Sequence, residues 1–165
     1  MIVIALGANL DSPAGPPAAT ITAALGALTQ YGVKIEAVSA FFATPAWPDR
    51  TDPPFVNAVI RVDAAYPPAV LMGILHKIES VYGRTRCAKN APRTLDLDLI
   101  DYQGWVEEGP PALPHPRMAQ RAFVLIPLSD VAPDWRHPVT GHSVAELIAA
   151  LPEESRAAVV RLAPA

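Results

Sequence analysis

The 165-residue sequence has little cysteine, no long apolar run and no excess of basic charge. Its single cysteine, Cys87, cannot form a disulfide within the chain, which suits a reducing compartment. No apolar run approaches the roughly 18–20 residues that a membrane-spanning helix needs. Residues 1–10 have neither the basic flank nor the apolar length of an export signal. We therefore expect a cytoplasmic protein that does not bind a membrane.

The net charge of −3 argues against a general nucleic-acid surface, because such surfaces draw their affinity from many Lys and Arg contacts to phosphate. A hydrophobic content of 51% in a chain of this length suits one compact domain spanning residues 1–165. We expect that domain to act as a monomer on small-molecule substrates.

Apolar periodicity predicts four strands in the first part of the chain, at residues 2–6, 33–44, 55–62 and 94–102. Two helices are expected between them. Pro16-Pro17 and Pro67-Pro68 are typical helix starts, and Gly32 and Gly83 can end these helices with a positive φ. The order β-α-β-β-α-β predicts an α+β, ferredoxin-like fold with a mainly antiparallel sheet and helices covering one face.

The rest of the chain is expected to add C-terminal helices to this core. Residues 118–131 are predicted to be partly helical, and Ser143 with Glu146 forms a capping-box pattern before another apolar segment. Between the second and third strands, the proline-rich segment 44–54 contains Trp47 and predicts an irregular loop.

Two aspartates within the fourth strand are the strongest indication of chemistry. Side chains alternate along a strand, so Asp96 and Asp98 project from one face while the flanking leucines pack on the other. Two adjacent carboxylates repel, and Mg²⁺ held by them together with substrate phosphates relieves that repulsion. The alternative is a solvent-exposed face where aspartates only maintain solubility. Asp101 breaks the alternation, and we assign it a turn or surface role.

A basic segment without acidic residues precedes these aspartates and contains Arg84, Arg86 and Arg93. Guanidinium groups match phosphate oxygens, and phosphoryl transfer depends mainly on positioning and charge neutralisation. Taken alone, arginines in a loop are more often simply solvated, but here they lie beside the aspartate pair. We expect the loop from Arg84 to Arg93 to be mobile without ligand and to become ordered with it.

Two further groups of residues suit a nucleotide and a heterocycle. His115 and Arg121 are close enough in sequence to meet one anion, and the nearby Phe123 offers a ring for stacking. In the third strand, Phe55 and Asn57 share a face, and an amide can both donate to and accept from a heterocycle edge.

Together these residues resemble the 6-hydroxymethyl-7,8-dihydropterin pyrophosphokinase (HPPK) family over nearly the whole chain. The run Pro92-Arg93-Thr94-Leu95-Asp96-Leu97-Asp98 is its most specific part. The other segments that carry the resemblance are Leu6-Gly7-Ala8-Asn9-Leu10, Thr44-Pro45, Phe55-Val56-Asn57-Ala58, Gly83-Arg84, and Pro114-His115-Pro116-Arg117-Met118 with Arg121 and Phe123.

The resemblance implies transfer of pyrophosphate from ATP, as co-substrate, to 6-hydroxymethyl-7,8-dihydropterin in folate synthesis. It implies that Asp96 and Asp98 hold two Mg²⁺ ions. The catalytic residues it implies are Arg84, Arg86, Arg93, Asp96 and Asp98. The ATP-binding residues are Glu79, Arg84, Arg93, His115 and Arg121. The pterin-binding residues are Thr44, Pro45, Phe55, Asn57 and Phe123.

Two other functions compete with this interpretation. A magnesium-dependent nucleotidyltransferase also suits a pair of aspartates on such a sheet, and a non-catalytic ligand-binding module suits a fold that has many functions. The chain also departs from many relatives in lacking a Trp in the basic loop, where it has Asn90-Ala91. Trp47 either supplies the missing aromatic cover or packs on the surface.

Overall fold

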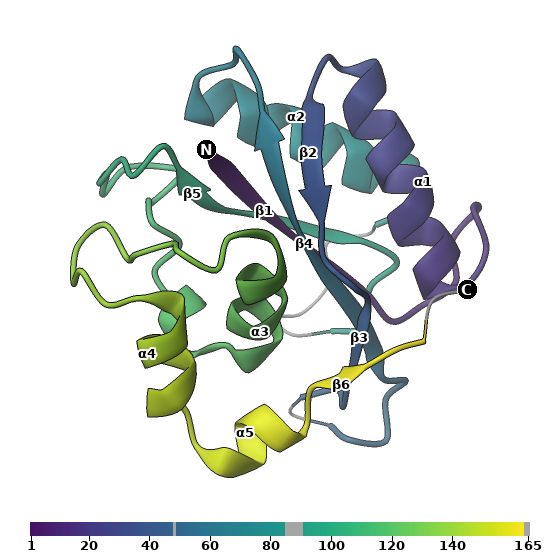
Figure 1. Cartoon of the computed structure of the whole chain (residues 1–165). Helices are drawn as coiled ribbons and strands as arrows, with labels where there is room; N and C mark the ends of the chain where they lie inside the picture. The colour runs from purple at the N-terminus through teal and green to yellow at the C-terminus, as the bar shows by residue number, and fades with distance from the viewer. Residues whose placement is uncertain (48, 85–90, 164–165) are drawn as a thin grey trace.

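The computed structural model describes residues 1–47, 49–84 and 91–163 (Figure 1). Its strands are β1 (Ile2–Ala8), β2 (Lys34–Val38), β3 (Phe42–Thr44), β4 (Phe55–Asp63), β5 (Asp96–Tyr102) and β6 (Val160–Arg161). Its helices are α1 (Pro17–Gln30), α2 (Pro68–Val81), the 3₁₀ turn η1 (Met118–Gln120), α3 (Ala122–Val131), α4 (Val144–Ala150) and α5 (Glu153–Ala157). Within the described ranges, no helix is long and apolar enough to cross a membrane.

The strands form one sheet in the order β5-β1-β4-β3-β6, with β2 also paired to β4, and every described pairing is antiparallel. The central strand β1 is almost completely buried, as its unbroken apolar sequence predicts. The α+β class and the mainly antiparallel sheet are confirmed, and the β-α-β-β-α-β order holds when β2 and β3 are counted as one strand. The short strand β6 extends the sheet beyond the ferredoxin-like core (Figure 1).

The prediction of one continuous strand over residues 33–44 is wrong, because the chain breaks into β2 and β3. Both pair with β4, β2 at its C-terminal half and β3 at its N-terminal end. At the break, the Ser39 hydroxyl accepts the Val59 N–H at 3.0 Å, and the next backbone N–H, of Ala40, donates to Asp130 on α3 at 3.1 Å. Side-chain oxygens thus replace ladder acceptors, which frees β3 to take its own direction.

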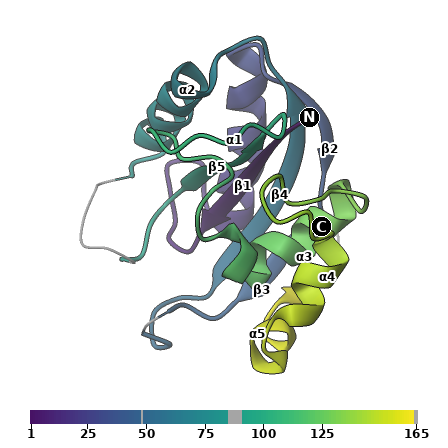
Figure 2. The same ribbon diagram turned by 90° about the vertical axis from the view of Figure 1, so that its left-hand side faces the viewer.

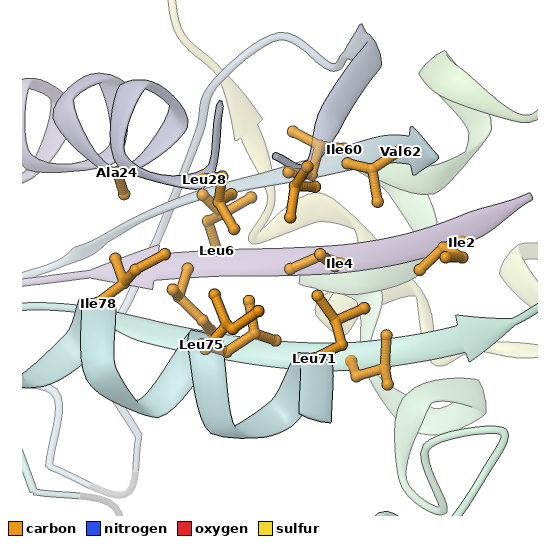
Figure 3. Packing of buried hydrophobic residues seen from close by; sticks show 14 of the residues in the cluster. Ile2, Ile4, Leu6, Ala24, Leu28, Ile60, Val62, Leu71, Leu75 and Ile78 are labelled. Atoms are coloured by element: carbon orange, nitrogen blue, oxygen red, sulfur yellow. The ribbon is translucent and has the colours of Figure 1, made fainter. Parts of the chain in front are cut away.

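Both faces of the sheet are covered, one by the two helices predicted between the strands and the other by the predicted C-terminal helices. The helices α1 and α2 pack on one face and form the larger apolar cluster, part of which Figure 3 shows around Leu6, Leu28 and Leu75. The C-terminal helices α3 and α4 pack on the other face around Val3, Val59 and Ile100. Figure 2 shows the two helical layers on opposite sides of the strands.

The helix boundaries follow the predicted signals. Both α1 and α2 have proline in the first turn, and the glycines that follow them have positive φ, 78° at Gly32 and 81° at Gly83. At α4, the Ser143 hydroxyl accepts the Glu146 N–H and the Glu146 carboxylate accepts the Ser143 N–H, which confirms the capping box. Residues 118–131 are helical in two pieces, η1 and α3.

Of the turn or surface role assigned to Asp101, the surface part is wrong, because its side chain is buried, whereas the turn part is confirmed by its bond to the turn that follows β5. A bulge in β5 shifts the register, so that Val3 faces Asp101 while Ile4 faces Leu99. Asp101 therefore accepts the indole N–H of Trp135 at 2.9 Å, and it also accepts the Gly104 N–H of the following turn at 3.1 Å. It connects the sheet to the C-terminal layer.

Replacing Asp101 with Ala should destabilise the fold. The change leaves the buried Trp135 indole N–H without its acceptor, and we expect a loss of about 2–4 kcal/mol in the free energy of unfolding. Urea denaturation measures this loss. The exposed Asp134→Ala variant is the matched control and should stay within about 0.5 kcal/mol of the wild type; equal stability of both variants would contradict the assignment.

Candidate active site

Three neighbouring strands place polar side chains in one row on the face of the sheet that α3 covers. In the antiparallel register, Gly7 of β1 is paired with Asn57 of β4 on one side and with Asp96 of β5 on the other. Further along the same face lie Val59 and Ile100, which pack under α3. The row of Asn57, Gly7 and Asp96 lies beyond this apolar patch, next to the start of α3.

Gly7 separates two halves of this row. Strands lie about 4.8 Å apart, so the backbones at Asn57 and Asp96 are roughly 10 Å from each other across β1. A Cβ at Gly7 would lie 3.2 Å from Asn57 Oδ1 and 3.9 Å from the Phe55 ring. Because Gly7 has no side chain, β1 makes no steric contact of this kind with the Asn57 amide. A glycine inside a strand was the available sequence signal for this close approach.

Asp96 is paired with two arginines. Arg84 Nη1 lies 2.6 Å from Asp96 Oδ1, and Arg93 Nη1 lies 3.1 Å from Asp96 Oδ2. The three side chains are 21–25% exposed, so they are partly screened from solvent without being sealed from it. Arg84 and Arg93, the predicted arginines of the basic segment that lie in the described ranges, therefore both meet the first aspartate. Arg86 and most of the loop expected to be mobile lie at residues 85–90, outside those ranges.

Asp98 faces two other predicted residues. Arg121 Nη1 lies 3.3 Å from Asp98 Oδ2, and His115 Nε2 lies 3.9 Å from the same oxygen. Burial lowers the pKa of His115, and the Arg121 and Arg117 guanidinium groups lower it further, although Asp98 opposes this shift. His115 Nδ1 accepts the Arg117 N–H at 3.2 Å, which assigns the proton of a neutral ring to Nε2, toward Asp98.

Glu79 lies beneath this arrangement rather than on its surface, with a relative exposure of 3%. Its carboxylate accepts the Leu97 N–H at 2.8 Å, between the two aspartates, and also pairs with Arg84. Burial raises the pKa of Glu79 to about 7, against the opposing effects of these two partners. Glu79 thus connects α2 to β5 and orients Arg84, and its predicted contact with nucleotide stays a prediction.

The residues predicted for the pterin lie on the β4 side of the row. Asn57 Nδ2 donates to Thr44 Oγ1 at 2.8 Å, and both side chains are buried. Phe123 lies at the start of α3 with the Arg121 guanidinium 5.5 Å from its ring centre. Trp47 is 71% exposed, so it does not pack on the surface in the described structure.

A cavity of about 440 Å³ lies behind β3 rather than over this row. It is lined by Ala43 and Val160, which face away from Thr44 along their strands, and by part of the 44–54 loop. Thr44 and Pro45 contribute to its wall, but Phe55, Asn57 and Phe123 do not. Of the five predicted pterin residues, this cavity therefore brings together only Thr44 and Pro45.

Asn9 is a further site residue to which the sequence reasoning gave no role. Its buried amide donates to the Pro53 carbonyl at 3.0 Å and accepts the Arg93 N–H at 2.8 Å, while the Asn9 backbone N–H donates to the Arg93 carbonyl at 3.1 Å. It therefore joins the 44–54 loop to the end of the basic segment. Asn after a buried strand was a signal only for a turn.

The aspartate pair suits a hard divalent cation that keeps ligands from elsewhere. Among the described residues, no group of three or more His, Cys, Asp or Glu side chains could hold a metal without other ligands. Mg²⁺ is commonly held by one or two carboxylates with water and substrate phosphates, and the partly exposed Asp96 and Asp98 fit that requirement.

Comparison with known families gives a match over most of the chain. The model of the 7,8-dihydro-6-hydroxymethylpterin-pyrophosphokinase (HPPK) family matches residues 3–133. A protein from Pseudomonas aeruginosa named 2-amino-4-hydroxy-6-hydroxymethyldihydropteridine pyrophosphokinase is 38% identical over 155 residues, covering 93% of each chain. A protein of the same name from Synechocystis is 35% identical over 148 residues, which cover 88% of this chain and 73% of that protein.

Solved structures share the fold. The HPPK-DHPS protein of Plasmodium falciparum superposes with a TM-score of 0.65 over 90% of this chain at 13% identity. A triple mutant of that protein gives a TM-score of 0.69 at the same identity. This chain spans less than half of those chains, 44% and 43% respectively. At such low identity the likeness concerns the fold alone.

The raised pKa of Glu79 predicts a pH-dependent stability. The pKa of Glu79 in the folded protein is about 7, whereas the pKa of an exposed Glu is 4.5. Between these values the unfolded state binds fewer protons, so wild-type stability falls as the pH rises. We expect Glu79→Gln to lose this dependence, so that the wild type loses on the order of 2 kcal/mol relative to the variant from about pH 5 to about pH 8.

Urea unfolding of both proteins at the two pH values measures this difference. The exposed Glu153→Gln variant removes a carboxyl group of the same kind and should follow the wild type at both values. If the difference in unfolding free energy between the wild type and Glu79→Gln is the same at both pH values, Glu79 is ionised in the folded protein over this range.

Proposed function

Because this chain belongs to the HPPK family, we propose that it transfers pyrophosphate from ATP to 6-hydroxymethyl-7,8-dihydropterin and releases AMP. The observation that carries the proposal is the row formed by Asp96, Gly7 and Asn57. It has paired carboxylates and arginines at one end and the buried Asn57 amide, hydrogen-bonded to Thr44, at the other. These are the groups that a polyphosphate and a flat heterocycle need, about 10 Å apart.

On the ATP side, we assign the polyphosphate to Arg84, Arg93 and Arg121, with His115 beside them. Each of these arginines now pairs with an aspartate, so both aspartates have cationic partners before the substrate arrives. Polyphosphate oxygens can replace the aspartates as partners of the guanidinium groups, which releases the carboxylates for a cation. Arg86 belongs to the same proposal through its position in the basic loop.

Asp96 and Asp98 are the residues that would hold Mg²⁺, two ions in the full proposal. When bound, the metal would neutralise charge on the phosphate oxygens and keep the chain of phosphates aligned. Two hydrogen bonds would fix the position of the metal-binding residues and of Arg93. The Glu79 carboxylate accepts the Leu97 N–H, between the two aspartates, and the Asn9 side chain accepts the Arg93 N–H. Both supports come from parts of the chain remote in sequence from β5.

On the acceptor side, Asn57 and Thr44 would hydrogen-bond the heterocycle edge, with Pro45 beside them and Phe55 and Phe123 flanking its faces. The hydroxymethyl oxygen would attack the β-phosphorus in line with the bridging oxygen that leaves with AMP. One P–O bond forms and one breaks, and the hydroxyl proton passes to solvent. The loose transition state of such transfers makes a dedicated base unnecessary.

Formation of AMP from ATP, Mg²⁺ and the hydroxymethyl dihydropterin tests the proposal. We expect AMP and a pyrophosphorylated pterin, and none without the pterin. We also expect a loss of about 10³-fold or more in kcat for Asp98→Asn, because a neutral amide oxygen is a weaker ligand for Mg²⁺ than a carboxylate and does not offset its charge. Asp63→Asn, at the exposed end of β4, is the control and should keep full activity.

Other products would identify a different enzyme or none. Free pyrophosphate with a nucleotidylated acceptor would assign a nucleotidyltransferase, and nucleotide binding without turnover would assign a binding module. Wild-type activity in a folded Asp98→Asn protein would remove Asp98 from the mechanism.

The bare backbone at Gly7 gives a separate prediction. An added methyl group would press on Asn57 Oδ1 from 3.2 Å, so Gly7→Ala should lower kcat/KM about tenfold, because small misplacements near reacting groups are costly. Its unfolding free energy should stay within about 1 kcal/mol of the wild type, since alanine suits a strand at least as well as glycine. Gly26→Ala on α1, where nothing lies within 4 Å, is the matched control. Full activity of Gly7→Ala would show that the site tolerates a side chain there.

A further inference from the structure

The C-terminal strand β6 covers the free edge of β3. In the antiparallel register, Arg161 faces Phe42 and Val160 faces Ala43. The pairing continues beyond β6, where the Leu162 N–H donates to the Phe41 carbonyl at 2.8 Å. Figure 1 shows this last segment lying against β3 after α5. The family match ends at residue 133, so α4, α5 and β6 lie outside it.

One carboxylate on α3 joins this strand to the chain that enters β3. Asp130 Oδ2 accepts the Ala40 N–H at 3.1 Å, and Asp130 Oδ1 pairs with Arg161 Nη2 at 2.6 Å. The Arg161 guanidinium also lies 5.1 Å from the centre of the Phe42 ring. Ala40, Phe42 and Arg161 are thereby held together from the side of α3.

The strand held in this way carries half of the acceptor side of the proposed site. β3 has three residues, and it ends at Thr44, whose hydroxyl accepts from Asn57. Phe42 is itself paired with Asn57 across the sheet. A strand this short makes few hydrogen bonds with β4, so its position depends on what lies along its other edge.

We propose that the segment from α5 to β6, together with Asp130, is a positioning element for the acceptor substrate: it holds β3 so that Thr44 and Asn57 present a fixed hydrogen-bonding edge. The kinetic part of this inference rests on the proposed function. The residues involved are positioning residues, since Thr44 and Asn57, and none of the C-terminal residues, would touch the substrate. Arg50 of the 44–54 loop also lies 3.0 Å from Glu154 of α5, but both side chains are exposed, so this pair adds little to the position of the loop.

The sharpest test compares Leu162→Pro with Leu162→Ala. Both remove the leucine side chain, but only proline removes the N–H that bonds to Phe41. Proline also favours an extended conformation at the preceding residue, so Arg161 can keep its strand geometry. Asp130→Asn provides a second variant, which retains the size of the side chain and loses its charge.

Two readouts are measured on the full chain: backbone hydrogen exchange in the peptide covering residues 40–46, and KM for each substrate. We expect faster exchange in Leu162→Pro and Asp130→Asn. We also expect KM for the pterin to rise about threefold to tenfold, the range for one lost hydrogen bond, with KM for ATP and kcat unchanged. Leu162→Ala should match the wild type in both readouts.

The two readouts separate this inference from the proposed function. If the wild type forms no AMP, the proposed function fails, whereas the exchange experiment still tests the hold on β3. Exchange at residues 40–46 that is the same in Leu162→Pro, Asp130→Asn and the wild type overturns the inference. An unchanged KM for the pterin, or an equal rise in KM for ATP, also overturns it.

Discussion

The register of three antiparallel strands is the constraint on which the site depends. β1 lies between β4 and β5, and its pairings bring Asn57 and Asp96 to either side of Gly7. A shift of one residue in either pairing would turn these side chains toward α1 and α2. The apolar packing of Leu6, Leu97 and Ala58 on the opposite face opposes that shift, so the core that stabilises the fold also orients the polar row.

Both carboxylates of the aspartate pair have cationic partners before any substrate is present. Asp96 and Asp98 meet Arg84, Arg93 and Arg121, and this pairing reduces the repulsion that two adjacent carboxylates would otherwise exert. Binding of a magnesium polyphosphate then amounts to an exchange of partners, with the anion taking the arginines and the cation taking the aspartates. Such an exchange creates no unpaired charge in a partly buried site, which lowers its cost.

Strict periodicity explains both the successes and the errors of prediction from sequence. Alternation along residues 95–99 predicted the split between leucines and aspartates, and proline and glycine predicted the ends of α1 and α2. Alternation failed at Asp101, because a bulge at the end of β5 changes its face without changing its sequence pattern. It also failed at Ser39, whose hydroxyl interrupts a run that is otherwise typical of one strand.

Contacts between remote segments could not be predicted in the same way. In the sequence, Glu79 is a single polar residue near the end of a helix, and nothing there indicates that its carboxylate accepts a backbone N–H of β5. Asn9, Asp130 and Arg161 likewise obtain their roles from partners more than 30 residues away. Glu79, Asn9 and Asp130 bind backbone groups of remote segments, whereas Arg161 pairs with the Asp130 carboxylate. Periodic patterns therefore describe the sheet and its faces, while the precision of the site comes from these polar links between its loops.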